Sequence, residues 1–65
     1  MFTKRQTVFY TPYGKTQAIR ARVETVHHDG TFTLLALFYQ RERQDVPGYL
    51  GFKYRLGPES MKATA

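Results

Sequence analysis

The chain of 65 residues contains no cysteine and no tryptophan, and only two histidines. Without cysteine it can form neither a disulfide framework nor a thiolate zinc site. It also lacks the run of roughly 20 apolar residues that a membrane-spanning helix requires. The first residues, MFTKRQT, lack the apolar core of a signal peptide. We therefore expect a cytoplasmic protein with no cofactor, no metal and no membrane partner.

The shortness of the chain limits how much surface it can bury. A domain of this size buries only about 60% of the surface that its unfolded chain exposes. The sequence shows no repeat, no low-complexity tract and no linker, so residues 1–65 form one domain. Good packing or self-association must then supply stability that disulfides cannot, and we expect a homo-oligomer.

Acidic residues are also scarce. Five Asp and Glu stand against ten Lys and Arg, which gives a formal net charge of +5. In so small a chain this excess creates a positive field that attracts polyanions. Nucleic acid is the favoured partner, and an acidic protein is the alternative.

Two segments of the N-terminal half have the residue types and the spacing of β-strands. The first, around Thr7 to Tyr10, is rich in β-branched and aromatic residues and is followed by turn residues. In TQAIRARVETVH, Ile19, Val23 and Val26 fit a helical period, whereas alternate residues from Ile19 onward fit the period of two of a strand. The next segment, TFTLLALFYQ, has strand composition, which favours the strand interpretation for both.

The stretch VETVHHDGTFTLL contains Asp29-Gly30, the strongest short-range signal for a β-hairpin. Two registers are possible, and in both of them Arg20 and Arg22 point away from the core. A loop of three residues, with Gly30 as a bulge, sends Leu35, Leu37 and Tyr39 inward. A two-residue loop places on the core side the pairs His27 with Phe32, Thr25 with Leu34, Val23 with Ala36 and Ala21 with Phe38.

The C-terminal half begins with a charged segment, QRERQD, which we expect to be a loop, and a turn at 46–48 follows it. The next segment, YLGFKYRLG, alternates strictly. It predicts one apolar face, with Gly51, Lys53 and Arg55 on the opposite face. Pro58 is suited to the first position of a helix, so the tail is predicted to form one short helical turn before it frays.

These segments predict an all-β fold of about four or five mostly antiparallel strands, in a small barrel or strongly curled sheet, because curling protects exposed edges. The run AIRARVETVHHDGTFTLLALF, residues 18–38, resembles the central hairpin of small SH3-like barrels in phage and other mobile-element proteins. This resemblance implies an SH3-like barrel. Such barrels serve as adaptors, nucleic-acid binders and oligomerisation modules, so the resemblance bears mainly on fold.

Catalytic or metal-binding chemistry finds little support in the sequence. His27 and His28 are neighbours on a strand, so their side chains point to opposite faces, and Asp29 suits the turn. No cysteine is present, and Ser60 lies in the tail. Glu24 lies between outward-facing arginines and is expected to form a surface ion pair. We expect no enzyme, unless several copies build a pocket at a symmetry axis.

The surface that remains combines cations with aromatic rings. Cations neutralise phosphates, and rings stack on unpaired bases, as in proteins that bind single-stranded nucleic acid. We therefore predict a nucleic-acid-binding face, with an assembly module as the alternative. Its phosphate contacts are Arg20, Arg22, Lys53 and Arg55, its stacking surfaces are Tyr39 and Tyr49, and its positive rim is Arg41 and Arg43.

The same outer face is expected to carry an apolar stripe beside Arg22. In one register this stripe is Leu35 and Leu37, and in the other it is Leu34 and Phe38. Exposed apolar stripes of this kind mark contact surfaces. Dimerisation through this stripe is the preferred expectation, and cover by the terminal segment is the alternative.

Overall fold

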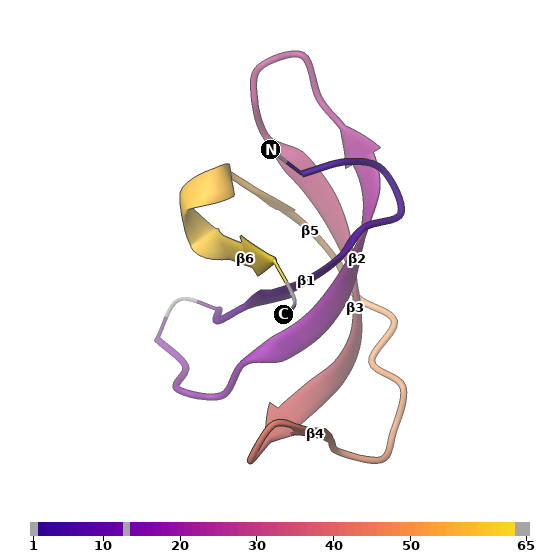
Figure 1. The fold of residues 1–65 in the computed structure, drawn as a ribbon, viewed down its shortest axis with the longest axis vertical. Helices are drawn as coiled ribbons and strands as arrows, with labels where there is room; N and C mark the ends of the chain where they lie inside the picture. Colours follow the sequence, from indigo (N-terminus) through magenta and orange to yellow (C-terminus); the bar gives the residue numbers. More distant parts are fainter. Residues whose placement is uncertain (1, 13, 64–65) are drawn as a thin grey trace.

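A computed structural model describes residues 2–12 and 14–63 and shows one curled antiparallel sheet (Figure 1). In these residues the sheet has six strands, with β4, β3, β2, β1 and β6 in spatial order and β5 paired beside β4 on β3. The all-β prediction is confirmed, with more strands than expected. The elements are β1 (Thr7–Tyr10), β2 (Ile19–Val26), β3 (Phe32–Arg41), β4 (Gln44–Asp45), β5 (Lys53–Leu56), the 3-10 turn η1 (Pro58–Ser60) and β6 (Met61–Ala63).

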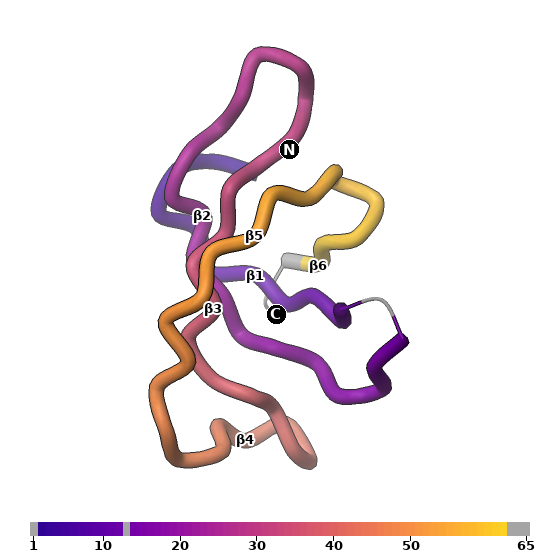
Figure 2. Tube along the Cα trace, turned by 180° about the vertical axis from the view of Figure 1, so that it is seen from behind, coloured from indigo at the N-terminus to yellow at the C-terminus, as the bar shows by residue number. Residues whose placement is uncertain are grey.

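The long β2–β3 hairpin is the frame of the sheet. It extends along the longest axis of the molecule, with its tip at one end and β4 at the other (Figures 1 and 2). At the tip, the His27 N–H donates to the Thr31 carbonyl over 2.9 Å, and the Gly30 N–H donates to the His27 carbonyl over 3.2 Å. Gly30 has φ +88°. This is the three-residue loop with a glycine bulge, one of the two expected hairpin loops.

Leu35 and Leu37 do not join the core cluster, so the expectation is wrong for them, whereas Tyr39 does lie on the inner face, opposite Ile19, and is 38% exposed. The register shifts by one residue between Val23 and Thr25, which brings Val23 opposite Leu34. A second shift occurs between Arg20 and Ala21. A shift of one residue exchanges the two faces of a strand. The shift between Val23 and Thr25 therefore gives β3 the inward face that a two-residue loop would have given it. That face consists of Phe32, Leu34 and Ala36 from β3, together with Ile19, Ala21 and Val23 from β2.

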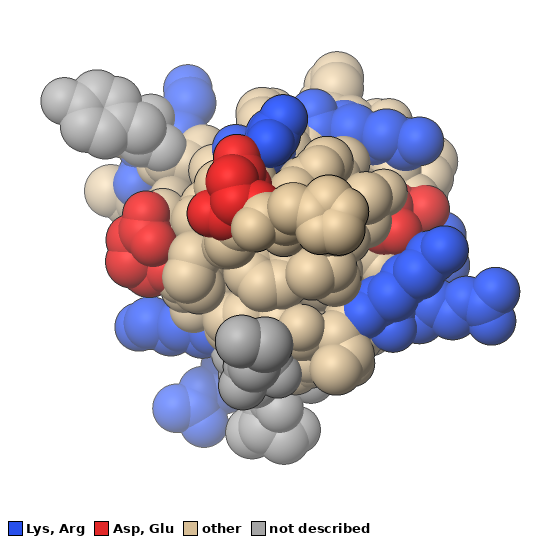
Figure 3. Space-filling view, turned by 90° about the horizontal axis from the view of Figure 1, so that it is seen from above, with Lys and Arg blue, Asp and Glu red and all other residues tan. Residues whose placement is uncertain are grey.

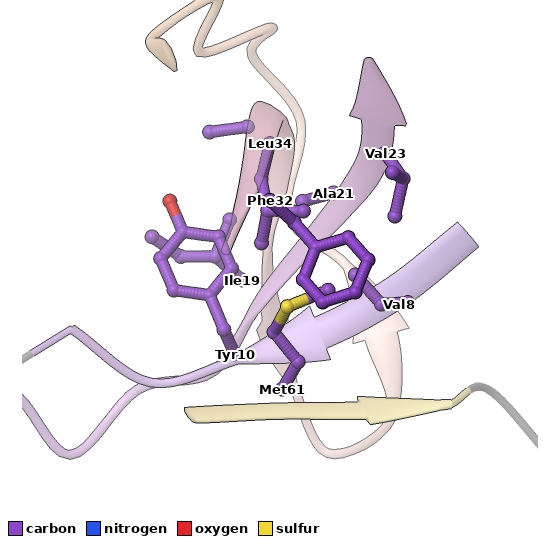
Figure 4. Packing of buried hydrophobic residues seen from close by; sticks show 9 residues of the cluster. Val8, Tyr10, Ile19, Ala21, Val23, Phe32, Leu34 and Met61 are labelled. Carbon is purple, nitrogen blue, oxygen red and sulfur yellow. The ribbon is translucent and has the colours of Figure 1, made fainter. Parts of the chain in front are cut away.

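The core is closed by the two ends of the chain. Val8 and Tyr10 of β1 point inward, and Met61 of β6 lies opposite Tyr10. Figure 4 shows these side chains packed against those of the central hairpin. Complete burial of one aliphatic side chain of this kind contributes about 1.5–3 kcal/mol. The predicted helical turn is confirmed as η1, but residues 61–63 continue as a strand instead of fraying.

The expected apolar stripe on the outer face is not exposed. Leu34 is fully buried in the core, and Leu35 is only 9% exposed. Leu37 and Phe38 are half-buried. None of these four residues is exposed, so they form no open stripe and give no support to dimerisation through this face.

The segment predicted as a charged loop is instead a tight hairpin. Gln40 and Arg41 of β3 pair with Asp45 and Gln44 of β4, which leaves Glu42 and Arg43 as the turn. Both turn residues have positive φ, 52° and 66°. This is the backbone of a type I′ turn, for which Asn-Gly is the favoured sequence, because other residues are strained in it. Glu42-Arg43 is not such a sequence, so no local residue pattern predicts this turn.

Replacing the turn by Asn-Gly (Glu42→Asn with Arg43→Gly) should raise the free energy of unfolding by about 1–2 kcal/mol, since it removes strain at two positions. The midpoint of thermal unfolding should rise by several degrees. As a control, Gln44→Gly, in the extended backbone of β4, should lower it. A double variant no more stable than the parent protein would contradict the conclusion that the Glu42-Arg43 turn is strained.

Candidate nucleic-acid interface

The outer face of the sheet carries a row in which cations alternate with aromatic rings. Residues that alternate with the buried side chains of β1 and β2 point outward, among them Phe9 and Arg20. Phe9 lies opposite Arg20 on one side and opposite Lys62 of β6 on the other. Arg20 in turn lies opposite Phe38 of β3. The order across the sheet is therefore Lys62, Phe9, Arg20 and Phe38.

Tyr49 extends this row beyond β3. Its ring meets that of Phe38 edge to face, with 6.3 Å between the ring centroids. Tyr49 is 62% exposed, which leaves most of the ring available for contact. Edge-to-face packing holds an exposed ring in a defined orientation. Tyr49 thus occupies the position expected of a stacking surface.

A second row lies one step along the strands. Arg22 is opposite Thr7 on β1 and Leu35 on β3, and Leu35 is opposite Lys53 on β5. Leu35 is therefore flanked by two cationic side chains, and long cationic side chains commonly lay their aliphatic stems over apolar neighbours. Arg22 and Lys53 are exposed. Their placement on one face matches the sequence prediction.

The two outward-facing arginines of β2, Arg20 and Arg22, already have acidic partners. Arg20 Nε lies 3.2 Å from Asp45 Oδ1, and Asp45 also accepts a hydrogen bond from the Gln40 side chain. The Arg20 guanidinium carbon lies 6.0 Å from the centre of the Phe9 ring. Arg22 Nε donates to Glu24 Oε1 over 2.9 Å, so Glu24 has the expected ion-pair role. Such exposed pairs contribute little stability, about 0–1 kcal/mol, so both arginines can exchange partners.

Arg55 has a structural task at the hairpin tip. Its Nη2 lies 2.8 Å from Asp29 Oδ2, and its Nε donates to the Thr31 hydroxyl over 2.9 Å. The Asp29 carboxylate also accepts hydrogen bonds from the Thr31 hydroxyl and backbone N–H, at 2.6 and 3.0 Å. The Thr31 hydrogen bonds, with Arg55 beside them, lower the pKa of Asp29 to about 2. Arg55 therefore links β5 to the hairpin tip, and its side chain has fixed partners that Lys53 lacks among the described residues.

The adjacent histidines lie at the start of the same hairpin tip. His27 Nε2 shares a hydrogen bond of 2.6 Å with the Thr33 hydroxyl, and His28 is exposed. Within residues 2–12 and 14–63, no group of three His, Asp or Glu side chains lies close enough to hold a metal ion. The stretch from His27 to Thr31 forms a hydrogen-bonded turn.

The remaining predicted site residues are divided between two places. Tyr39 lies opposite Ile19, on the inner face, and so does not share the face of Arg20 and Tyr49. Arg41 and Arg43 are exposed at the β3–β4 turn, which lies beyond the end of the row. The structure therefore brings together Arg20, Arg22, Lys53 and Tyr49.

Two residues of this face were missed by sequence reasoning. Phe9 was not placed on the face, and Lys62 lay in a tail expected to fray. Phe38 was expected on the outer face in one of the two registers, as part of the apolar stripe beside Arg22. The alternation of Phe9 with Val8 and Tyr10 was a usable signal for its outward position. Lys62 had no such signal, because its place depends on the pairing of β6 with β1.

The basic charge does not form one uninterrupted patch. Seen from above, Lys and Arg side chains lie on several sides of the molecule, with Asp and Glu side chains between them (Figure 3). A positive field of this kind attracts polyanions to the molecule as a whole. The arrangement of cations and rings must therefore determine which surface binds them.

Comparisons with known proteins give no match: no protein family, no curated protein and no solved structure is similar to this chain. In the part of the chain that the structure describes, no helix has both the length and the apolar character needed to cross a membrane. The proposals below therefore rest on the geometry of the chain itself.

The carboxylate of Asp29 should make the stability of the hairpin tip depend on pH. Because folding lowers its pKa from 3.8 to about 2, the stabilisation is present above about pH 4 and is lost as the pH falls through about 2. Asp29→Asn should therefore lower the thermal midpoint at pH 7 and converge with the parent protein near pH 2. A difference that is the same at both pH values would contradict this role.

Proposed function

We propose that the chain is a non-enzymatic, cytoplasmic binding module whose outer face holds single-stranded nucleic acid. The observation that carries the proposal is the row of Lys62, Phe9, Arg20 and Phe38, in which cations and rings alternate across four strands. Bases can stack on ring faces without regard to sequence, while cations neutralise the phosphates between them. Phe9 and Phe38 are half-buried, so each leaves only part of its ring for such a contact. The face supplies both elements at neighbouring positions.

The spacing of the cations supports the same proposal. Arg20 and Arg22 are two residues apart on β2, so their backbones are separated by about 7 Å along the strand. Lys53 adds a third cation in the row of Arg22. An extended strand of nucleic acid crossing the sheet thus meets a cation repeatedly. Tyr49, at the end of the first row, offers the most exposed ring.

The fold is consistent with this function. The described residues form a single, strongly curled and unclosed antiparallel sheet. From the resemblance of residues 18–38 alone, we propose that the chain is a small SH3-like barrel of the phage or mobile-element type. Since that fold hosts several functions, the proposal depends on the surface and not on the fold.

Lys53→Gln should weaken binding to a labelled single-stranded oligonucleotide. Lys53 has no ion-pair partner among the described residues, so its loss removes a phosphate contact directly. Loss of one such contact on a single strand should make the slope of log affinity against log salt shallower by about 0.7. Fluorescence anisotropy across a salt series measures both quantities.

Lys15→Gln provides the matched control, because it removes the same charge from an exposed residue of the β1–β2 loop, outside both rows. Its salt slope should equal that of the parent protein. Absence of binding by the parent protein at low salt would overturn the proposed function. Equal effects of the two substitutions would show that net charge, and not this face, determines affinity.

The second candidate function is protein interaction or assembly, and a different surface favours it. Tyr39, Phe52 and Tyr54 are exposed rings of the inner face, near the unclosed side of the sheet. The ring of Tyr54 contacts those of Tyr10 and Phe52, with centroid distances of 5.6 and 6.5 Å. Burial raises the pKa of Tyr10, with Tyr54 and Tyr39 adding to the rise. Contiguous exposed rings of this kind are typical of contact surfaces.

Phe52→Ser tests the assembly function. Phe52 is 55% exposed, so the substitution should leave the folded monomer intact. If the rings form a contact between copies, light scattering should show an oligomer for the parent protein and a monomer for the variant. An oligomer that survives in the variant, or a monomeric parent protein, would count against self-assembly through these rings.

A further inference from the structure

An open hollow of about 1150 Å³ lies at the end of the outer-face row. Three separate parts of the chain surround it: the β1–β2 loop, the β3–β4 turn, and η1 with β6. Its lining mixes polar residues with apolar ones such as Phe9 and Ala18, and its charged members are three cations and one carboxylate. It includes Arg20, Arg43, Lys62, Thr16, Ser60 and Glu59.

Two of the three cations are held in place by the sheet. Arg20 and Lys62 are the two cross-strand neighbours of Phe9, so the pairing of three strands sets their separation. Arg20 is further fixed by the Phe9 ring and by Asp45, which does not line the hollow. The contact of Asp45 with Arg20 Nε lacks hydrogen-bond geometry, and the buried Nε–H has no acceptor among the described residues. Because Nε is buried, an anion in the hollow would contact the two terminal nitrogens of the guanidinium.

The third cation, Arg43, reaches the hollow from a strained turn. Within the described residues, positive φ at a residue other than glycine occurs only at Arg5, Glu42 and Arg43. Both arginines line hollows, since Arg5 borders a second, smaller one with Lys4 and Arg22. Strained backbone is typically retained where it serves a binding site. The strained backbone at Glu42 and Arg43 places Arg43 in the lining of the hollow.

We propose that this hollow binds a phosphate monoester, such as the terminal phosphate of a nucleic-acid strand or the phosphate of a nucleotide. Three cations against the single carboxylate of Glu59 leave a surplus of two positive charges in the lining. A phosphate monoester carries a charge of about −1.5 to −2 at pH 7, whereas each backbone diester carries only one negative charge. The volume leaves room for the attached sugar. The proposal rests on the proposed function, because a strand anchored there continues along the row.

The test compares oligonucleotides of one sequence that carry a phosphate at the 5′ end, at the 3′ end or at neither end. The parent protein should bind one phosphorylated form about tenfold more tightly than the form without a terminal phosphate. Arg43→Gln should abolish this preference. Arg41→Gln removes the same charge from the same hairpin but outside the hollow, and it should retain the preference.

Arg43→Gly shows whether the phosphate preference is lost because the cation is removed or because the protein unfolds. It relieves the strain at a positive-φ position, so the variant should be at least as stable as the parent protein and still lose the preference. Equal affinity of the parent protein for all three oligonucleotides would exclude a strand terminus as the source of the phosphate, and equal losses in Arg41→Gln and Arg43→Gln would overturn the proposal. Either result leaves the outer face to be judged by the salt series alone.

Titration of the isotopically labelled protein with inorganic phosphate, followed by nuclear magnetic resonance, separates this site from the outer face. Amide shifts at Thr16 and Ser60 that vanish in Arg43→Gln support the hollow even if no oligonucleotide binds. In that case the source of the phosphate is a free nucleotide or phosphate. Absence of shifts at these residues, together with absence of a terminal-phosphate preference, would exclude the site.

Discussion

The register of β2 against β3 is the constraint on which the rest of the structure depends. The glycine loop at residues 28–30 starts the hairpin in a register that would turn Leu35 and Leu37 inward. The irregularity between Val23 and Thr25 moves the pairing by one residue and keeps Leu34 in the core. Because side chains alternate strictly between faces, the same irregularity decides which residues of β3 share the outer face with Arg20 and Arg22.

The outer face follows from that register together with the closure by the chain ends. Arg20 points outward because Ile19 and Ala21 are buried on either side of it. It gains Phe9 as a neighbour from β1 and Phe38 from β3, and β6 then adds Lys62 beyond Phe9. One row thus combines residues from four strands that lie far apart in the sequence. A binding surface of this kind is a product of pairing, not of any local motif.

The two ends of the molecule use charge differently. At the hairpin tip, the Asp29 carboxylate gathers Thr31 and Arg55 into a cluster that joins β5 to the loop. At the opposite end, Arg43 stands in a strained turn beside a hollow in which cations outnumber carboxylates. The first arrangement satisfies its charges internally and stabilises the fold. The second leaves positive charge available for a ligand, and so it favours anion binding.

The sequence by itself determined the all-β class, the hairpin around Asp29-Gly30 and the outward direction of Arg20, Arg22 and Lys53. These features follow from alternation and turn chemistry, which act over a few residues. The tertiary structure decided the compensating bulge, the inward position of Tyr39, the strained turn at Glu42 and Arg43, and the strand that places Lys62 beside Phe9. Each of these depends on pairing between distant segments, where the burial of a shared core overrides local preference.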